Sequence, residues 1–181
     1  MFEEYLEDSL YFAKEAIIQK DASSSKRHFR VSVFCSMSSI ESYVNYMIDT
    51  LLKGFKLEGY EKAFLTDKHF DVFNGSFKIT SQNEYHKIDD KIRYLLCKST
   101  PTFDFNKNAS WSRLLEFKRF RDSLIHPKQV ADINSLTEYK KRIKIGLEAI
   151  ILIMNHICKG IFKKPLRKHI LDIIDELKTI K

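Results

Sequence analysis

The chain has 181 residues, which is enough for one domain with a substantial hydrophobic core. Hydrophobic residues make up 44% and charged residues 30%, a balance that excludes a wholly disordered chain. The formal net charge of +7 favours polyanionic partners through counterion release, but it indicates no sequence preference.

Residues that favour turns are scarce, with only five Gly and three Pro. This scarcity favours long helices over many short strands. We therefore predict an all-α fold, an up-and-down bundle of about five long helices in a single domain spanning residues 1–181.

The first two predicted helices cover residues 2–19 and about 25–53. The first places apolar side chains on one stripe and acidic side chains in its first turns, where the helix dipole favours them. The second carries a heptad-like apolar seam, which we expect to face the other helices of the bundle; a coiled-coil dimer is the alternative. The seam consists of Val33, Met37, Ile40, Val44, Met47 and Leu51.

The middle of the chain holds the only pattern typical of strands. After a short helical segment at residues 60–65, residues 70–80 alternate around Asn74-Gly75, a pair that suits a type I′ hairpin turn. We predict a small β-hairpin inserted in the helical scaffold. Residues 81–97 then predict an amphipathic helix with Tyr85 facing inward, and residues 100–109 a loop.

Residues 111–125 predict the helix that we expect to carry the functional motif. Ser110 is a candidate N-cap, and Pro127 predicts an end at Ile125, because a proline biases the preceding residue away from helical dihedrals. The apolar residues recur at helical spacing. They are Trp111, Leu114, Leu115, Phe117, Phe120, Leu124 and Ile125.

The last two predicted helices are strongly apolar. One starts near Ser135 and runs to about residue 161, with a nearly continuous apolar centre that indicates burial on several sides or in a dimer interface. The other begins near Pro165, a favourable residue for a first helical turn.

The end of the motif helix places Arg121, Asp122 and His126 within six residues. Arginine keeps its charge and presents a donor fork that suits phosphate, and histidine exchanges protons near neutral pH. Together they could cleave RNA without a metal, with a base for the 2′-hydroxyl and a cation for the developing charge. The alternative is structural, because a histidine that ends a helix often only interacts with the last carbonyls.

This Arg–polar–x-x-x–His motif on the penultimate long helix resembles the signature of the HEPN family (higher eukaryotes and prokaryotes nucleotide-binding). The resemblance implies a helical bundle that dimerises and brings two motifs together across a cleft. Many members are metal-independent endoribonucleases, often toxins of toxin–antitoxin pairs or phage-defence effectors. It also implies that Arg121 and His126 are the catalytic pair and that Asp122 helps to orient the histidine.

Other polar residues could support such a site. Lys118, Arg119 and Lys128 flank the motif and are candidate RNA-binding residues. Glu41 and Asn45 lie four positions apart beside the seam of the second helix. They form either a solvated face with a local contact or a polar pair that reaches the active cleft behind the catalytic residues.

We expect no cofactor and no metal. The three cysteines Cys35, Cys97 and Cys158 are far apart and predict reduced thiols of a cytoplasmic protein. No glycine-rich phosphate loop and no Ser or Cys nucleophile pattern occurs. The acidic N-terminus does not resemble a targeting peptide, and the apolar run 149–154 is shorter than the roughly 20 residues of a membrane span, so no membrane partner is expected.

Three functions are compatible with these patterns. The first is a homodimeric endoribonuclease that cleaves single-stranded RNA by 2′-hydroxyl attack. The second is a catalytically silent dimerisation or nucleic-acid-binding module with the same fold. The third is an interaction subunit for a separately encoded enzyme, which would bind through the hairpin at residues 70–80. An antitoxin or an effector partner protein is a further candidate partner of the chain.

Overall fold

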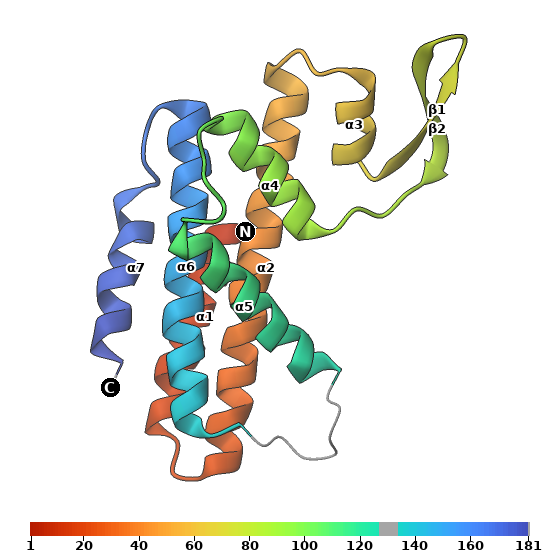
Figure 1. Ribbon diagram of the computed structural model, residues 1–181. Coiled ribbons are helices and arrows are strands. Elements are labelled where there is room, and N and C mark those ends of the chain that lie inside the picture. The colour runs from red at the N-terminus through yellow and green to blue at the C-terminus, as the bar shows by residue number, and fades with distance from the viewer. Residues whose placement is uncertain (127–133, 181) are drawn as a thin grey trace. The chain divides into compact units, whose positions relative to one another are not determined.

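The computed structural model describes residues 1–126 and 134–180 (Figure 1). The contacts within the chain divide it into two compact units. Unit 1 comprises residues 1–42 and 96–181, and unit 2 comprises residues 43–95. The predicted all-α fold with a β-hairpin insertion is confirmed. Residues of α2 and of α4 belong to both units. That residues 1–181 form a single domain stays a prediction. Among the described residues the elements are α1 (Phe2–Ile18), α2 (Ala22–Gly54), α3 (Gly59–Leu65), β1 (Lys68–Phe73), β2 (Ser76–Asn83), α4 (Ile88–Ser99), α5 (Ala109–Ile125), α6 (Leu136–Phe162) and α7 (Lys168–Thr179).

Unit 1 is built around α6, which contacts α1, α5 and α7. Its apolar residues occupy more than one side of the helix, as predicted, because several neighbours cover it. The buried residues of α6 are Tyr139, Ile143, Gly146, Leu147, Ala149, Ile150, Ile151, Ile153, Met154 and Ile157.

By length and hydropathy, α6 would also qualify as a membrane span among the described helices, with a mean hydropathy of 1.6 over its most apolar window. The core helix of a water-soluble fold meets the same criterion. The absence of a membrane partner therefore stays a prediction.

Aromatic packing fixes α5 on α6. The Phe117 ring lies directly against Gly146, where any Cβ would be 2.2 Å from two ring carbons. One turn further on, Phe120 meets Tyr139 edge to face with centroids 5.4 Å apart. Tyr139 in turn stacks on Phe29 of α2 at 5.7 Å, so three helices share one aromatic column.

Buried hydroxyl groups join α1 to α2. Ser9 Oγ lies 2.6 Å from Ser36 Oγ, and Ser32 Oγ donates to the carbonyl oxygen of Ser9 at 2.7 Å. All three serines are fully buried, so the bonds replace the water that these hydroxyls would otherwise bind.

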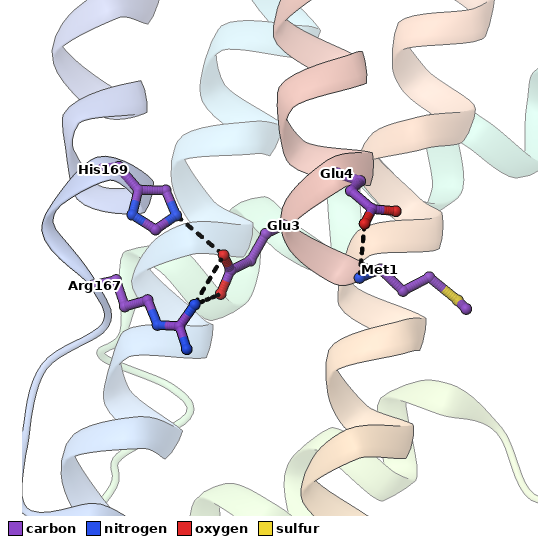
Figure 2. Close-up of polar contacts among 5 residues, drawn as sticks. All are labelled: Met1, Glu3, Glu4, Arg167 and His169. Atoms are coloured by element: carbon purple, nitrogen blue, oxygen red, sulfur yellow. Dashed lines mark hydrogen bonds and ion pairs between the residues drawn. The ribbon is translucent and has the colours of Figure 1, made fainter.

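An acidic side chain near the start of α1 holds the beginning of α7 (Figure 2). The Glu3 carboxylate accepts hydrogen bonds from Arg167 Nη1 at 3.2 Å and from His169 Nε2 at 3.1 Å. In the same view the Met1 amino group pairs with Glu4 at 3.6 Å. Glu3 therefore connects two helices that are distant in the sequence.

Unit 2 contains the hairpin, which has the predicted two-residue turn. Asn74 and Gly75 have φ values of 49° and 78°, the positive angles that a type I′ turn requires, and Phe73 pairs with Ser76. The hairpin packs on α3 in part through Tyr60 and Phe77, whose ring centroids are 5.5 Å apart. This contact supplies the packing that an isolated two-stranded ribbon lacks.

Two polar connections hold unit 2 together. Glu61 Oε2 accepts from the Glu58 N–H at 2.9 Å, and its Oε1 accepts from the Tyr94 hydroxyl at 2.7 Å. Asp67 accepts from Lys91 Nζ at 2.6 Å and from the His86 N–H at 2.9 Å. Burial alone would raise the pKa of Asp67, but these two hydrogen bonds outweigh it and hold the pKa below its ordinary value.

Three sequence predictions were wrong in detail. The helix predicted over 81–97 starts only at Ile88, because residues 81–83 continue β2 and Asn83 pairs with Lys68. Tyr85, predicted to face inward, is 82% exposed. The N-cap of α5 is Asn108, whose side chain accepts from the Trp111 N–H at 2.9 Å, and not Ser110.

The contact between Phe117 and Gly146 yields a stability prediction. Phe117 is only 2% exposed, so the ring cannot move aside without disturbing the core. We expect Gly146→Ala to lower the free energy of unfolding by about 1–3 kcal/mol, the usual cost of overpacking. Gly54→Ala is the matched control, because a Cβ there meets nothing within 4 Å. Thermal unfolding should show a drop of roughly 2–12 °C for the first variant; equal midpoints for the two variants would contradict the packing.

The Lys91–Asp67 pair yields a prediction that depends on pH. We expect Lys91→Met to destabilise the protein by about 1–2 kcal/mol at neutral pH, allowing for the solvent exposure of Asp67. Because the folded-state pKa of Asp67 is lowered, its contribution is present above the unfolded pKa of about 3.9 and is lost as the pH falls through the folded pKa. The difference between parent and variant should therefore shrink below about pH 4.

Urea unfolding of both proteins across this pH range measures the effect. The matched control is Lys53→Met, which removes an ion pair of the same 2.6 Å length that is exposed on α2. An exposed pair of this kind contributes at most about 0.5 kcal/mol. Equal losses for Lys91→Met and Lys53→Met would show that burial adds nothing at Asp67.

Candidate functional site

The C-terminal end of α5 carries the predicted motif. The helix ends at Ile125, as Pro127 predicts, and His126 is its C-cap with φ −119° and ψ 65°. The His126 N–H still donates to the Asp122 carbonyl at 2.9 Å. The last turn of α5 is therefore closed by the backbone, and the His126 side chain leaves the helix from a non-helical position.

Arg121 is held by two carboxylates within unit 1. Its Nη2 lies 3.3 Å from Glu41 Oε1 on α2, and its Nε lies 3.2 Å from Asp122 Oδ1. The Nε atom is buried and makes no hydrogen bond, so its contact with Asp122 is an ion pair without hydrogen-bond alignment. The Arg121 side chain is 21% exposed, which leaves part of it in contact with solvent.

His126 is exposed, and its imidazole makes no hydrogen bond or ion pair with any residue that the structure describes. In particular, no hydrogen bond joins it to Arg121, although the two residues lie near one helix end. Arg121 is directed to Glu41 and Asp122 instead. The described residues thus contain an anchored cation and a separate, solvent-accessible imidazole.

The supporting residues have different surroundings. Arg119 is exposed, whereas Lys118 is half-buried and has interactions of its own. Lys128 lies outside the described residues. Asn45 is exposed on α2, one turn after Glu41, but it belongs to unit 2. Of these two candidates on α2, only Glu41 contacts Arg121 within one unit.

Sequence analysis did not single out a second basic feature, a pocket between α5 and α6 lined by Arg113, Lys141 and Arg142. Arg113 precedes Arg121 by two turns of α5, but that spacing alone is common on solvated helix faces. The two cations of α6 lie in a different part of the sequence. Only the packing of the two helices brings them together.

The described residues contain no group of three His, Cys, Asp or Glu side chains that could hold a metal ion. The three cysteines are free, and burial raises the pKa of the Cys35 thiol. Neither feature adds a nucleophile to the end of α5.

The chain matches no protein-family model, no curated protein and no solved structure. The resemblance of the motif to the HEPN signature therefore stays a prediction.

Proposed function

We propose that this protein is a metal-independent endoribonuclease of the HEPN type that cleaves single-stranded RNA. The observation that carries the proposal is the arrangement at the end of α5, where a guanidinium anchored by Glu41 lies on the same helix end as the exposed imidazole of His126. An oriented cation and an accessible proton-transfer group are the two parts that the reaction needs.

In the proposed reaction His126 takes the proton of the ribose 2′-hydroxyl. The 2′-oxygen then attacks the adjacent phosphorus, and the bond from phosphorus to the 5′-oxygen breaks. The leaving oxygen takes up a proton, so the products are a 2′,3′-cyclic phosphate and a 5′-hydroxyl. The proton donor is an imidazolium from a second copy of the chain, because each chain brings one motif.

Arg121 would stabilise the charge that develops on the phosphorane oxygens. A guanidinium has five N–H donors, and the contacts with Glu41 and Asp122 are made by Nη2 and Nε. The two N–H groups of Nη1 and one of Nη2 are left for a phosphate. Glu41 then acts as a positioning residue that keeps the guanidinium in one orientation.

The distribution of charge supports an anionic substrate for unit 1. Residues 43–95 contain eight Lys and Arg and eight Asp and Glu, so the whole excess of +7 lies in the rest of the chain. Unit 1 is also the unit that contains the motif. The net positive charge of unit 1 as a whole would raise the concentration of a polyanion near it.

A specific observation also favours the second candidate, a nucleic-acid-binding module without catalysis. Two carboxylates flank the single guanidinium, so the group of Arg121, Glu41 and Asp122 has a formal charge of −1. A net negative charge opposes the close approach of a scissile phosphate. RNA binding that weakens with salt, without any cleavage, would support this candidate.

Substitution of the two motif residues tests the proposal. In total RNA with a chelator present, we expect His126→Ala to reduce cleavage by about 10²–10⁴-fold. Arg121→Ala should reduce it by roughly 10²–10³-fold, the usual loss for one group that stabilises a developing negative charge. The measurement is the rate of appearance of 2′,3′-cyclic phosphate ends.

The control for these variants is Lys164→Ala, which removes an exposed cation just after the C-terminal end of α6. This variant should keep full activity. Circular dichroism and thermal unfolding should show that all three variants are folded. His126→Ala should keep the parental melting temperature, since the exposed imidazole makes no hydrogen bond or ion pair with the described residues. Undiminished cleavage by folded His126→Ala would refute the proposal.

Asp122→Asn separates the two candidate functions. The amide removes one of the two negative charges beside Arg121, so the guanidinium should attract a phosphate more strongly. We expect cleavage to increase roughly two- to fivefold, as for the loss of one partly exposed ion pair. If the parent and this variant both bind RNA and neither cleaves it, the module without catalysis is the better description.

A further inference from the structure

A small pocket lies between α5 and α6 in unit 1, away from the residues of the motif. Arg113 and Glu116 of α5 and Lys141 and Arg142 of α6 form its polar lining. Three cations and one carboxylate give the lining itself a formal charge of +2, and Glu138 and Glu148 beside it pair with the two arginines and offset this charge. The pocket is a candidate site for an anion because Lys141 has no carboxylate partner among the described residues and the arginines keep unbonded Nη donors.

The cations of the pocket keep donors for a ligand. Arg113 Nη1 lies 3.8 Å from Glu148, and Arg142 Nη1 lies 3.8 Å from Glu116, and both separations are too long for hydrogen bonds. Only the Arg142 Nε is engaged closely, by Glu138 at 2.6 Å. Lys141 is exposed and makes no hydrogen bond or ion pair with the described residues. An anion that enters the pocket would thus replace loose ion pairs.

The size of the pocket limits the ligand to a small group. Its volume of about 160 Å³ equals that of about five water molecules at roughly 30 Å³ each. It is well below the roughly 300–1,000 Å³ of sites that enclose a whole small molecule. One phosphate group with its remaining water fits, whereas a complete nucleotide does not.

The rest of the pocket lining is apolar. It consists of Phe117, Ile145 and Gly146, and the Phe117 ring occupies the place that a Cβ of residue 146 would take. An apolar lining keeps water away from one side of a bound anion, which strengthens its attraction to the surrounding cations.

We propose that this pocket binds one backbone phosphate of a single-stranded RNA whose scissile bond lies at the motif. The choice of RNA rests on the function proposed above. Arg113 precedes Arg121 by eight residues on α5, about 12 Å along the helix axis and about 80° around it. A strand that follows α5 would therefore reach the pocket a few nucleotides away from the site of cleavage.

Binding, measured without cleavage, tests the proposal. The probe is a short fluorescein-labelled single-stranded RNA, titrated with the 181-residue chain that carries His126→Ala. Adding Arg113→Ala and Lys141→Ala should weaken binding roughly tenfold at low salt, as expected for the loss of hydrogen bonds to a charged group. The slope of log K against log salt should fall by about 0.7 for each phosphate that the protein no longer neutralises. The affinity for single-stranded DNA of the same sequence should fall by the same factor, because the pocket would not contact the 2′-hydroxyl.

A second variant should act in the opposite direction. Glu116→Gln removes the carboxylate that competes for Arg142, so RNA should bind several-fold more tightly, a gain that a folding defect cannot produce. Lys164→Ala is the matched control, because it removes the same charge far from the pocket. Lys164→Ala should change the RNA affinity, and the slope of log K against log salt, less than Lys141→Ala does as a single substitution.

The outcomes separate this inference from the proposed function. If the pocket variants weaken RNA binding and the parent chain cleaves no RNA, the inference is supported and the proposed nuclease activity is refuted. Cleavage by the parent with no effect of the pocket variants supports the nuclease and overturns the inference. If inorganic phosphate binds in the pocket and the protein has no affinity for RNA, the pocket is a site for a small anion. That result would overturn the inference as well.

Discussion

The contact between the Phe117 ring and Gly146 is the constraint on which the candidate site depends. Without a Cβ at residue 146, α5 approaches α6 so closely that the ring occupies that place. Phe120 and Tyr139 continue the same interface one turn further along α5. Because α5 runs as one continuous helix to Ile125, this interface fixes where Arg121 and the end of the helix lie. Close packing of this kind is the usual source of precision in a site.

The charges around α5 are balanced and not simply basic. Arg121 is flanked by Glu41 and Asp122, and each arginine of the pocket has a carboxylate within 4 Å. A single small anion would have to displace such a carboxylate at each contact. A polyanion makes several contacts at once, so its gain from counterion release exceeds the loss of several weak ion pairs. This arrangement therefore favours an extended phosphate backbone over an isolated phosphate.

Local patterns predicted much of the fold because they depend on neighbours in the sequence. Asn74-Gly75 set the hairpin turn and Pro127 the end of α5, since each acts within two residues of the feature that it determines. The start of α4 was missed because Asn83 is drawn into the strand by its pairing with Lys68, a contact between residues 15 positions apart. Helical periodicity cannot reveal such a contact.

The site could be predicted only in part for the same reason. The residue types and spacing of Arg121, Asp122 and His126 indicated the candidate motif, but they did not predict the partners of Arg121. Glu41 lies 80 positions away from Arg121, and sequence analysis left open whether it faced solvent or the site. The pocket depends on a missing Cβ at Gly146, and a glycine within a helix otherwise predicts only a loss of stability.

The carboxylates beside Arg121 bear on how the proposed reaction would work. A guanidinium alone would disfavour a protonated imidazole next to it. Glu41 and Asp122 pair with Arg121 and offset its positive charge. Cleavage also needs an acid for the leaving oxygen, and one imidazole cannot be base and acid in the same step. A single motif is therefore chemically incomplete, and two copies that face one substrate would supply both protonation states.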